Sequence, residues 1–269
     1  MALGGHSRQD DLLRISDALT SSLRLVRRMT RRPVAVEEKS PGDPVTAVDR
    51  AVDTLLKATL PNQFEGWLSE ETLDDPARLD RDRVWVVDPI DGTREFVRGI
   101  PEWCVSIGLV ENGRAVAGGV GNPSTGAVVL GSLETGVYWC GARVEPRACR
   151  SRQEAVVLAS RNEFRNGLWD GCESDGFALQ PMGSAAWKLA QIAGGRADAT
   201  WTFNPRNEWD IAAGVALVHA AGGSVARAGG AVIEFNRPDP LLVGGFTAFA
   251  QGARDLFAPV IAAHAAALA

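Results

Sequence analysis

An apolar run in the N-terminal half of the chain leads directly into two carboxylates, a glycine and a threonine. The run is Val84-Trp85-Val86-Val87, and the segment that follows it is Asp88-Pro89-Ile90-Asp91-Gly92-Thr93. The apolar run predicts a buried strand, and anionic side chains at its end need a counter-charge, because unpaired buried charge is costly. Hard oxygen donors favour Mg²⁺ or a similar cation, and exposed N–H groups of the glycine and threonine could bind a phosphate. The segment therefore indicates metal-assisted phosphoryl chemistry.

A covalent aspartyl-phosphate mechanism is the main competing interpretation of this segment. In the D-x-D-G-T pattern of the haloacid-dehalogenase phosphatases, the two aspartates are two residues apart and point the same way from a strand. Here Asp88 and Asp91 are three residues apart, with a proline and an isoleucine between them. This spacing breaks the geometry of nucleophile and acid, and it leaves the carbonyl oxygen of Ile90 available as a ligand. We therefore exclude the covalent mechanism.

The elements before this segment are predicted to bring further carboxylates to it. Apolar residues at helical spacing predict an amphipathic helix from about 10 to 30. Residues 43–46 are typical of a turn, and they lead into a second helix that ends near residue 60 and carries Asp49 in its first turns. A short strand is predicted at 64–69, and it ends in the pair Glu70-Glu71.

The chain after this segment is predicted to form hairpins and then an alternation of helices and strands. The expected antiparallel strands cover 104–111, 114–122, 127–133 and 137–140, with Gly, Asn and Pro turn signals between them. Later strands are expected at 155–159, 177–180 and 197–201. Helices are expected at 162–171, from Gly183-Ser184 onward and from Trp209-Asp210 onward. Two short strands and an Ala-rich helix are expected to end the chain. No regular βαβ rhythm appears, so a layered α/β or α+β sandwich is favoured over a Rossmann fold. We divide the chain into an N-terminal half, 1–145, which carries most of the candidate metal ligands, and a C-terminal half, 146–269, which carries the substrate-specificity elements and Asp210.

Composition and charge narrow the class of protein. The 269 residues are 45% hydrophobic and 23% charged, as in ordinary globular proteins, and the formal net charge of −5 disfavours a nucleic-acid polymer as partner. A negative net charge does not exclude a nucleotide ligand, because bound metal ions can supply the positive charge at its binding site. The four cysteines form no C-x-x-C pair, so reduced thiols are expected rather than zinc or disulfides. No apolar run has the length of a membrane span or a secretory segment, so we expect a cytoplasmic protein without a membrane partner.

Taken one at a time, the acidic candidates also have structural interpretations, such as a helix N-cap for Asp210 or a solvated turn for Glu70-Glu71. The full set is Asp49, Glu70-Glu71, the 88–93 segment, and Trp209-Asp210 followed by Gly222-Gly223. The presence of these motifs, in this order along the chain, resembles one superfamily. This is the lithium-sensitive, magnesium-dependent phosphatase superfamily, which includes inositol monophosphatases, fructose-1,6-bisphosphatases, histidinol phosphatases and 3′(2′),5′-bisphosphate nucleotidases. The resemblance spans nearly the whole chain and implies a layered αβαβα sandwich.

The resemblance also implies a role for each matching residue. The implied metal ligands are Glu70, Asp88, the carbonyl of Ile90, Asp91 and Asp210. Asp49 and Thr93, with Glu70, are implied to orient and deprotonate the attacking water, and the backbone of Gly92 and Thr93 to contact phosphate. The implied cofactor is two to three Mg²⁺ ions, with Mn²⁺ as a substitute and Li⁺ as an inhibitor. The implied partners are a small phosphorylated substrate and a second copy of the chain in a homodimer.

The substrate branch is inferred from the residues around Asp210. Inositol and histidinol phosphatases commonly have Glu seven residues before this Asp, and Phe203 stands there in this chain. Phe203, Asn207 and Arg161 instead resemble the CysQ-type bisphosphate nucleotidases, in which Arg161 would pair with a second phosphate and Phe203 or Trp187 would border an adenine. The remaining predicted substrate contacts are Gly183 and Ser184. We therefore expect 3′-phosphoadenosine 5′-phosphate as substrate.

Two alternatives to this substrate remain. Residues 96–101 also resemble the inositol and histidinol branches, so inositol 1-phosphate, histidinol phosphate, fructose 1,6-bisphosphate or another sugar phosphate is the second candidate. A non-catalytic regulatory homologue is the remote one, and it is disfavoured because the complete acidic set is present.

Overall fold

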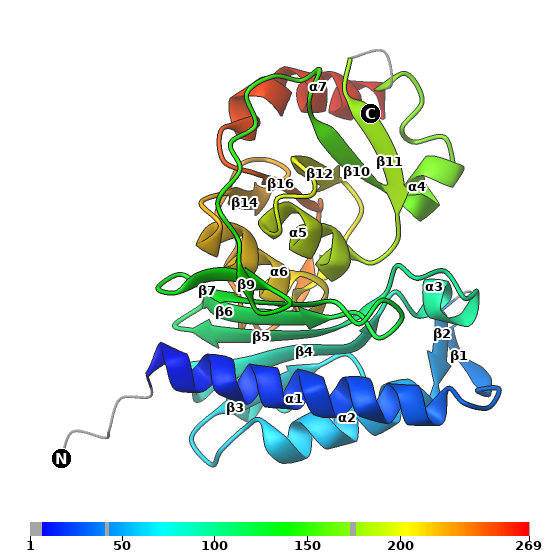
Figure 1. The fold of residues 1–269 in the computed structure, drawn as a ribbon, viewed down its shortest axis with the longest axis vertical. Helices are drawn as coiled ribbons and strands as arrows, with labels where there is room; N and C mark the ends of the chain where they lie inside the picture. Colours follow the sequence, from blue (N-terminus) through cyan, green and yellow to red (C-terminus); the bar gives the residue numbers. More distant parts are fainter. Residues whose placement is uncertain (1–6, 41–42, 173–175, 269) are drawn as a thin grey trace.

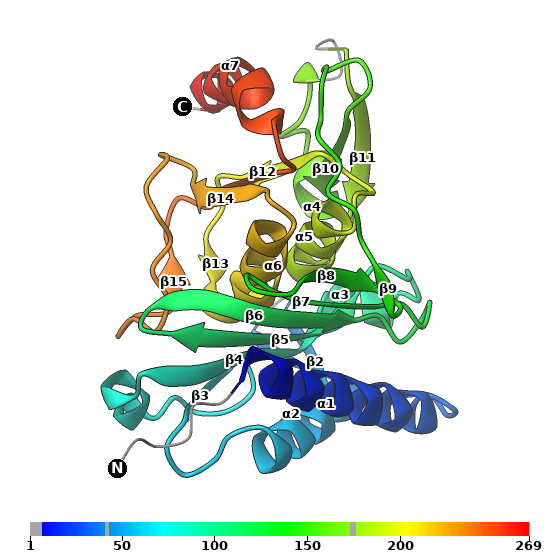
Figure 2. The ribbon, with the colours of Figure 1, turned by 60° about the vertical axis from the view of Figure 1, so that its left-hand side comes forward.

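Helices and sheets alternate through the molecule in layers. The structure, a computed structural model, describes residues 7–40, 43–172 and 176–268. Figures 1 and 2 show α1 and α2 beneath a large sheet, α5 and α6 above it, then a second sheet, and α7 on the far side. These helices are α1 Arg8–Met29, α2 Ala47–Thr59, α5 Ala185–Ala193, α6 Glu208–Ala220 and α7 Ala253–Ala267. The predicted αβαβα sandwich is confirmed.

The large sheet has seven strands in the order β3-β4-β5-β6-β7-β8-β9. The strands are β3 Gly66–Ser69, β4 Arg83–Asp91, β5 Cys104–Glu111, β6 Arg114–Gly121, β7 Val128–Ser132, β8 Gly136–Trp139 and β9 Ala142–Arg143. β3 is parallel to β4, and each later pair is antiparallel, as the turn signals between the apolar runs predict. The predicted hairpins are therefore confirmed.

Both faces of the large sheet are covered, which explains why its central strands are apolar on both sides. The apolar stripes of α1 and α2 pack on one face. On the other face α6 approaches closely, because a Cβ atom at Gly108 or Gly118 would come within 2.8 or 2.4 Å of the backbone of Ala213. α6 lies between the two sheets, so it is apolar all round and begins at Glu208 with its polar residues at one end.

The second sheet has five strands in the order β11-β10-β12-β16-β14. They are β10 Val156–Ser160, β11 Ala178–Met182, β12 Ala199–Thr202, β14 Ser224–Arg227 and β16 Phe246–Phe249. The helix predicted at 162–171 is wrong in length: α4 spans only Arg161–Arg165. The chain leaves the helix through turns at Gly167 and Gly171, whose φ angles of 75° and 87° lie in the left-handed region.

Short elements complete the described chain. They are β1 Val36–Ser40, β2 Asp43–Thr46, a 3₁₀ turn at Pro76–Asp80, α3 Thr93–Val97, β13 Arg206–Asn207 and β15 Leu241–Leu242. The turn predicted at 43–46 is instead the strand β2, which pairs with β1. Among the described residues no helix is both long and apolar enough to cross a bilayer. No disulfide joins the four cysteines, all of which lie among the described residues.

Candidate active site

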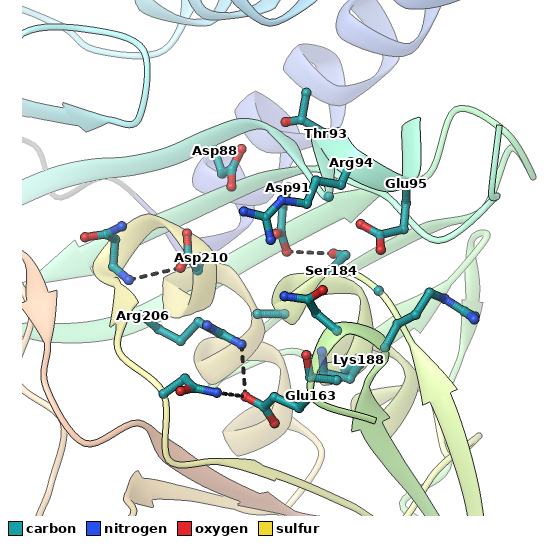
Figure 3. Close-up of a pocket in the computed structure, with 18 of the residues that line it drawn as sticks. Asp88, Asp91, Thr93, Arg94, Glu95, Glu163, Ser184, Lys188, Arg206 and Asp210 are labelled. Atoms are coloured by element: carbon teal, nitrogen blue, oxygen red, sulfur yellow. Dashed lines mark hydrogen bonds and ion pairs between the residues drawn. The ribbon is translucent and has the colours of Figure 1, made fainter. Parts of the chain in front are cut away.

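A cavity of about 650 Å³ lies where the end of β4 meets α3, α4, α5 and α6. Most of the residues predicted to form a site line it, although they come from both halves of the chain. They are Glu70, Asp88, Ile90, Asp91, Gly92, Thr93, Arg161, Gly183, Ser184, Asn207 and Asp210. Figure 3 shows the carboxyl groups of Asp88, Asp91 and Asp210 facing a common space. Folding therefore concentrates oxygen donors at one point of the molecule.

An irregularity in β4 aims two carboxylates into this cavity. The strand extends to Asp91, four residues beyond the predicted end at Val87. Asp88 pairs with Ser106 and Asp91 with Cys104, and the register shifts between these two pairs. On a regular strand, side chains three residues apart point to opposite faces, whereas a bulge can redirect one of them. The shift thus allows Asp88 and Asp91 to line the same cavity.

Gly92 turns the chain from β4 into α3. Its φ angle is 96°, and a Cβ atom there would lie 3.1 Å from both the carbonyl oxygen of Glu102 and the Cβ atom of Trp103. A side chain at this position would therefore be both strained and crowded. The turn places Thr93 at the cavity wall, directly after the strand that carries Asp91.

Thr93 and Asp49 are brought together from different elements. The Thr93 hydroxyl lies 3.3 Å from Asp49 Oδ1 and 3.0 Å from the carbonyl oxygen of Ile90. Asp49 is 2% exposed and lies behind Thr93, and the backbone N–H of Thr46 donates to Asp49 Oδ2 at 2.8 Å. Burial raises the pKa of Asp49, although its hydrogen bonds from Thr46 oppose this effect.

The carboxylates of the cavity destabilise one another's ionised forms. Burial, followed by the charges of Glu70, Asp91 and Asp210, raises the pKa of Asp88 well above its ordinary value. Burial and the charges of Asp91 and Glu70 raise the pKa of Asp210 to about 8. Burial also raises the pKa of Asp91, but the Ser184 hydroxyl and the N–H of Ala186, both 2.6 Å from Asp91 Oδ2, oppose the rise. Such a group needs a nearby positive charge to stay ionised.

The residue types of this group fit a hard cation such as Mg²⁺. They supply carboxylate oxygens and one backbone carbonyl, which are the donors that Mg²⁺ prefers. Across the described parts of the chain, no three His, Cys, Asp or Glu side chains are already gathered as a metal site. Several donors are instead engaged elsewhere: Glu70 pairs with Lys39 at 2.9 Å, and Asp91 accepts the Ser184 hydroxyl. The chemistry of the donor set fits a metal, and Lys39 supplies part of the counter-charge.

Several cations that were not predicted also line the cavity. They are Arg94, Arg98, Arg165, Lys188 and Arg206. Lys188 is 5% exposed, and burial and the charge of Arg206 lower its pKa to about 8. Its signal in the sequence is a single lysine within the apolar helix α5, four residues after Ser184. Figure 3 shows Lys188 and Arg206 on the side of the cavity away from Asp88.

Arg161 lines the cavity, as expected, but its guanidinium group is already paired. Its Nε atom donates to Glu102 Oε2 at 2.9 Å, and an Nη2 hydrogen bond of 3.1 Å reaches the carbonyl of Pro181. Its Nη2 also contacts Glu102 Oε1, so the pair is bidentate. A second phosphate would therefore compete with Glu102 for this side chain.

The two predicted aromatic contacts lie outside this cavity. Trp187 is 5% exposed and packs on Trp139, with ring centroids 5.7 Å apart, so the prediction that it borders a base here is wrong. Phe203 contacts His264 at 5.5 Å and faces an adjoining cavity instead. The reason is that β12 ends at Thr202, where the chain carries Phe203 toward α7.

Comparisons with known proteins found similar sequences and structures over most of the chain. A family model described as the inositol monophosphatase family matches residues 10–265, a range that includes all of these carboxylates. A fructose-1,6-bisphosphatase/inositol-1-monophosphatase from Thermotoga maritima is 33% identical over 195 residues, which cover 70% of this chain and 73% of the relative. A 3′(2′),5′-bisphosphate nucleotidase CysQ from Escherichia coli is 32% identical over 223 residues, which cover 80% and 89%. The crystal structure of the extragenic suppressor protein suhB from Bartonella henselae has a TM-score of 0.80 at 26% identity, covering 92% and 96%.

Proposed function

This chain belongs to the inositol monophosphatase family, a family of metal-dependent phosphatases, and from that premise we propose that it is a Mg²⁺-dependent 3′(2′),5′-bisphosphate nucleotidase. As a phosphoric monoester hydrolase of this kind, it would convert 3′-phosphoadenosine 5′-phosphate into AMP and phosphate. The observation that carries the proposal is the group of cations that faces the carboxylates across the cavity.

These cations favour a substrate with two phosphates. A single phosphate at the carboxylate end would be held by bound metal ions, and it would leave Lys188 and Arg206 without an anionic ligand on the other side. Lys188 is buried, and burying an ammonium group is costly unless it meets a counter-charge. Arg206 Nη2 lies 3.5 Å from Glu163 Oε1, which neutralises one of these two cations. A second phosphate near Lys188 would supply the charge that the protein itself provides only in part.

In this proposal the Thr93–Asp49 pair orients the attacking water. The Thr93 hydroxyl can donate to Asp49 while its oxygen accepts a hydrogen bond from water in the cavity. Asp49 is a stronger base than an exposed aspartate, because burial raises its pKa, so it can take the proton that Thr93 relays. The water oxygen forms the new bond to phosphorus, the ester P–O bond breaks, and the departing alkoxide takes a proton from solvent.

Glu70, Asp88, the Ile90 carbonyl, Asp91 and Asp210 would hold the metal ions. Bound there, Mg²⁺ would neutralise phosphate charge and lower the pKa of a coordinated water. The protein contributes the position of these oxygens: Ser184 and Ala186 fix Asp91, and the register shift in β4 fixes Asp88 beside it. We propose two to three Mg²⁺ ions in turnover, Mn²⁺ as a substitute, and inhibition by Li⁺.

An inositol or sugar phosphate is the second candidate substrate. The Thermotoga maritima relative, which is named for activity on fructose 1,6-bisphosphate and inositol 1-phosphate, is as similar in sequence as the CysQ relative, at 33% against 32% identity. The metal site would serve either class of substrate, and the far-side cations would favour fructose 1,6-bisphosphate, which also has two phosphates, as much as the nucleotide.

A phosphate-release assay tests the proposal. The purified chain is incubated with Mg²⁺ and, in separate reactions, 3′-phosphoadenosine 5′-phosphate, inositol 1-phosphate, histidinol phosphate and fructose 1,6-bisphosphate, with and without Li⁺. We expect kcat/KM for the nucleotide to exceed the others by about ten-fold or more, equivalent to about 1.4 kcal/mol. A preference for inositol 1-phosphate, histidinol phosphate or fructose 1,6-bisphosphate would instead establish the second candidate.

A further inference from the structure

Glu102 joins three segments around the cavity. It lies between α3 and β5, and the Nε atom of Arg161, the first residue of α4, donates to its Oε2 at 2.9 Å. The backbone N–H of Gly183, between β11 and α5, donates to the same oxygen at 2.8 Å. Arg161 also donates to the carbonyl oxygen of Pro181 in β11 at 3.1 Å. The Glu102–Arg161 pair, which we call the strut, therefore fastens α4 and the turn before α5 to the segment before β5.

The turn that the strut holds has an uncommon backbone conformation. Ser184 has a φ angle of 56°, in a region that residues with a Cβ atom rarely adopt. Gly183 is crowded as well, because a Cβ atom there would lie 2.5 Å from the Cδ atom of Glu95. Strained backbone of this kind persists only where its surroundings hold it, and it is common at functional sites. The hydrogen bond from Gly183 to Glu102 is one of the contacts that hold this turn.

The same turn supplies the donors that orient Asp91. The Ser184 hydroxyl and the N–H of Ala186 each donate to Asp91 Oδ2 at 2.6 Å, and Figure 3 shows the bond from Ser184. The Ser184 oxygen also accepts the N–H of Trp187 at 2.9 Å, which caps α5. A shift of the turn would move both donors away from Asp91, so the contacts that hold the turn also orient this carboxylate.

The surroundings of Arg161 suit this role better than they suit a second phosphate. Its hydrogen bonds to Glu102 raise the pKa of the guanidinium group, and the charge of Glu95 adds to the rise. Glu95 lines the cavity beside Ser184, so a phosphate at Arg161 would approach two carboxylates. The phosphate would also have to displace Glu102, which would release Gly183. Repulsion between like charges and the loss of these hydrogen bonds both oppose such binding.

We propose that the strut positions the metal site: it holds the Gly183–Ser184 turn so that Asp91 is aimed at the bound cation. Glu102 and Arg161 are then positioning residues that do not touch the substrate. The inference rests on the proposed function, since it needs the carboxylates to bind Mg²⁺, but it applies to any substrate of this site. Loss of the strut should therefore reduce Mg²⁺ affinity and slow the turnover of every substrate alike.

Calorimetric Mg²⁺ titration tests the strut without turnover. We expect Glu102→Ala to weaken Mg²⁺ affinity by about ten-fold, an effect typical of losing a residue that supports a metal ligand. Arg161→Ala should weaken the affinity less, because Glu102 can still accept the Gly183 N–H. Glu102→Gln should stay near the wild type, because its amide oxygen can accept the same hydrogen bond. Arg254→Ala, at an exposed position of α7, should leave the affinity unchanged.

A double variant tests whether Glu102 acts through the turn. Ser184→Ala removes one of the two donors to Asp91, so adding Glu102→Ala should weaken Mg²⁺ affinity by less than the product of the two separate losses. Losses that multiply would show that Glu102 acts independently of the turn, and they would overturn the inference.

Kinetics with 3′-phosphoadenosine 5′-phosphate and inositol 1-phosphate distinguish the strut from a phosphate site. With Mg²⁺ below saturation, Arg161→Ala should lower kcat/KM for both substrates by the same factor. A rise in KM confined to the bisphosphate, with Mg²⁺ affinity unchanged, would overturn the inference and place Arg161 at a second-phosphate site. Unchanged Mg²⁺ affinity in a folded Glu102→Ala protein would also overturn it.

The proposed function can fail separately. A wild-type protein that binds no Mg²⁺ would overturn the proposed function and the strut with it, whereas a wild-type protein that binds Mg²⁺ as tightly as its folded strut variants do would overturn the strut alone. If Glu102→Ala melts at a much lower temperature than the wild type, Arg161→Ala provides the comparison, because it leaves the hydrogen bond from Gly183 in place. Mg²⁺ affinity and kcat/KM that both stay unchanged in Arg161→Ala would then overturn the inference.

Discussion

Lys188 and Arg161 show how pairing decides what a cation can do at this site. Both line the cavity, but Arg161 is held by Glu102 in a bidentate pair. Lys188 has only a 3.5 Å contact with the carbonyl of Met182 among its described hydrogen bonds, and its pKa is lowered to about 8 by burial. A phosphate near Lys188 would stabilise the charged form, whereas a phosphate at Arg161 would have to displace a carboxylate.

We therefore predict that Lys188→Met raises KM for 3′-phosphoadenosine 5′-phosphate by about ten-fold or more, because a buried charge pair is lost. KM for a monophosphate such as inositol 1-phosphate should change by less than about two-fold. Steady-state kinetics with both substrates measure this split, and Lys57→Met on the exposed face of α2 is the matched control. Equal changes in KM for both substrates would remove Lys188 from the second-phosphate site.

The sequence predicts the acidic residues of the site better than its basic ones. Asp88 and Asp91 stand in a short segment whose composition is unsuited to a core, so they are recognisable without a structure. Lys39, Lys188 and Arg206 lie in three different elements, and each looks like an ordinary charged residue in its own segment. Their proximity to the carboxylates depends on how β1, α5 and β13 fold against β4, which local spacing does not encode.

α2 carries two buried carboxylates, one turn apart, that hold residues of the site from behind. Asp49 holds Thr93, and Asp53, four residues later, is buried beside the turn after β3. Asp53 Oδ1 accepts the Ser69 hydroxyl at 2.6 Å, and Oδ2 accepts the Thr72 hydroxyl at 2.5 Å. These two hydroxyls flank Glu70-Glu71 in the sequence, so a single helix positions both the proposed water-orienting pair and a proposed metal ligand.

Asp53→Ala should therefore weaken Mg²⁺ binding by about ten-fold. Loss of a residue that holds a metal ligand in place commonly weakens metal binding by about 10- to 100-fold, and we expect the lower end of this range. Calorimetric Mg²⁺ titration measures this directly, and kcat at saturating Mg²⁺ should fall much less than the affinity. Ser69→Ala and Thr72→Val should each reproduce part of the loss, whereas Thr54→Val, on the exposed side of α2, should not. Unchanged Mg²⁺ affinity in a folded Asp53→Ala protein would show that the contacts are only structural.

The pattern of apolar and turn residues predicts which helices and strands form better than it predicts where they end. The hairpins from β5 to β8 follow their turn signals, and α1 and α2 follow their apolar stripes. β4 continues to Asp91 despite Pro89, because its pairing with β5 resumes after the register shift. α4 stops at Arg165, since Gly167 adopts a left-handed turn. Both differences arise from tertiary pairing and backbone conformation, which periodicity does not report.

Across the whole molecule, a buried ionic network ties the first helix layer to the large sheet. Glu65 receives hydrogen bonds from Arg14 Nη2 at 2.6 Å and from Trp85 Nε1 at 2.9 Å, so it connects α1 with β4. Burial raises the pKa of Glu65, but these hydrogen bonds outweigh burial and lower it from 4.5 to about 2. Folding therefore favours the ionised form of this carboxyl group.

The stabilisation from Glu65 is fully present above its unfolded pKa of about 4.5 and is lost as pH falls toward 2. We predict that Glu65→Gln lowers the free energy of unfolding by about 2–3 kcal/mol at pH 7 and by progressively less below pH 4.5. Denaturant unfolding of both proteins between pH 2.5 and 7 gives this difference, with Glu38→Gln at an exposed position of β1 as control. A difference that stays constant across this range would contradict the proposed origin of the shift.

The layered architecture also explains why residues from distant parts of the sequence line one cavity. α6 passes between the sheets and begins beside the end of β4, so Asp210 lines the same cavity as Asp88 and Asp91. The family resemblance allows this layering to be predicted, whereas composition alone indicates only a sandwich of helices and sheets. The cavity is a product of the packing of α5 and α6 against the large sheet, and no single segment contains it.

We assign the carboxylates at the end of β4 as the catalytic metal site, and the variant Asp91→Asn tests this assignment. We predict that the variant keeps the wild-type melting temperature within a few degrees but loses about 10³-fold in kcat at saturating Mg²⁺, about 4 kcal/mol of transition-state stabilisation. Asp17→Asn, at an exposed position of α1, should retain full phosphate release. Near-normal Mg²⁺-dependent phosphate release by a folded Asp91→Asn protein would contradict the assignment of the site.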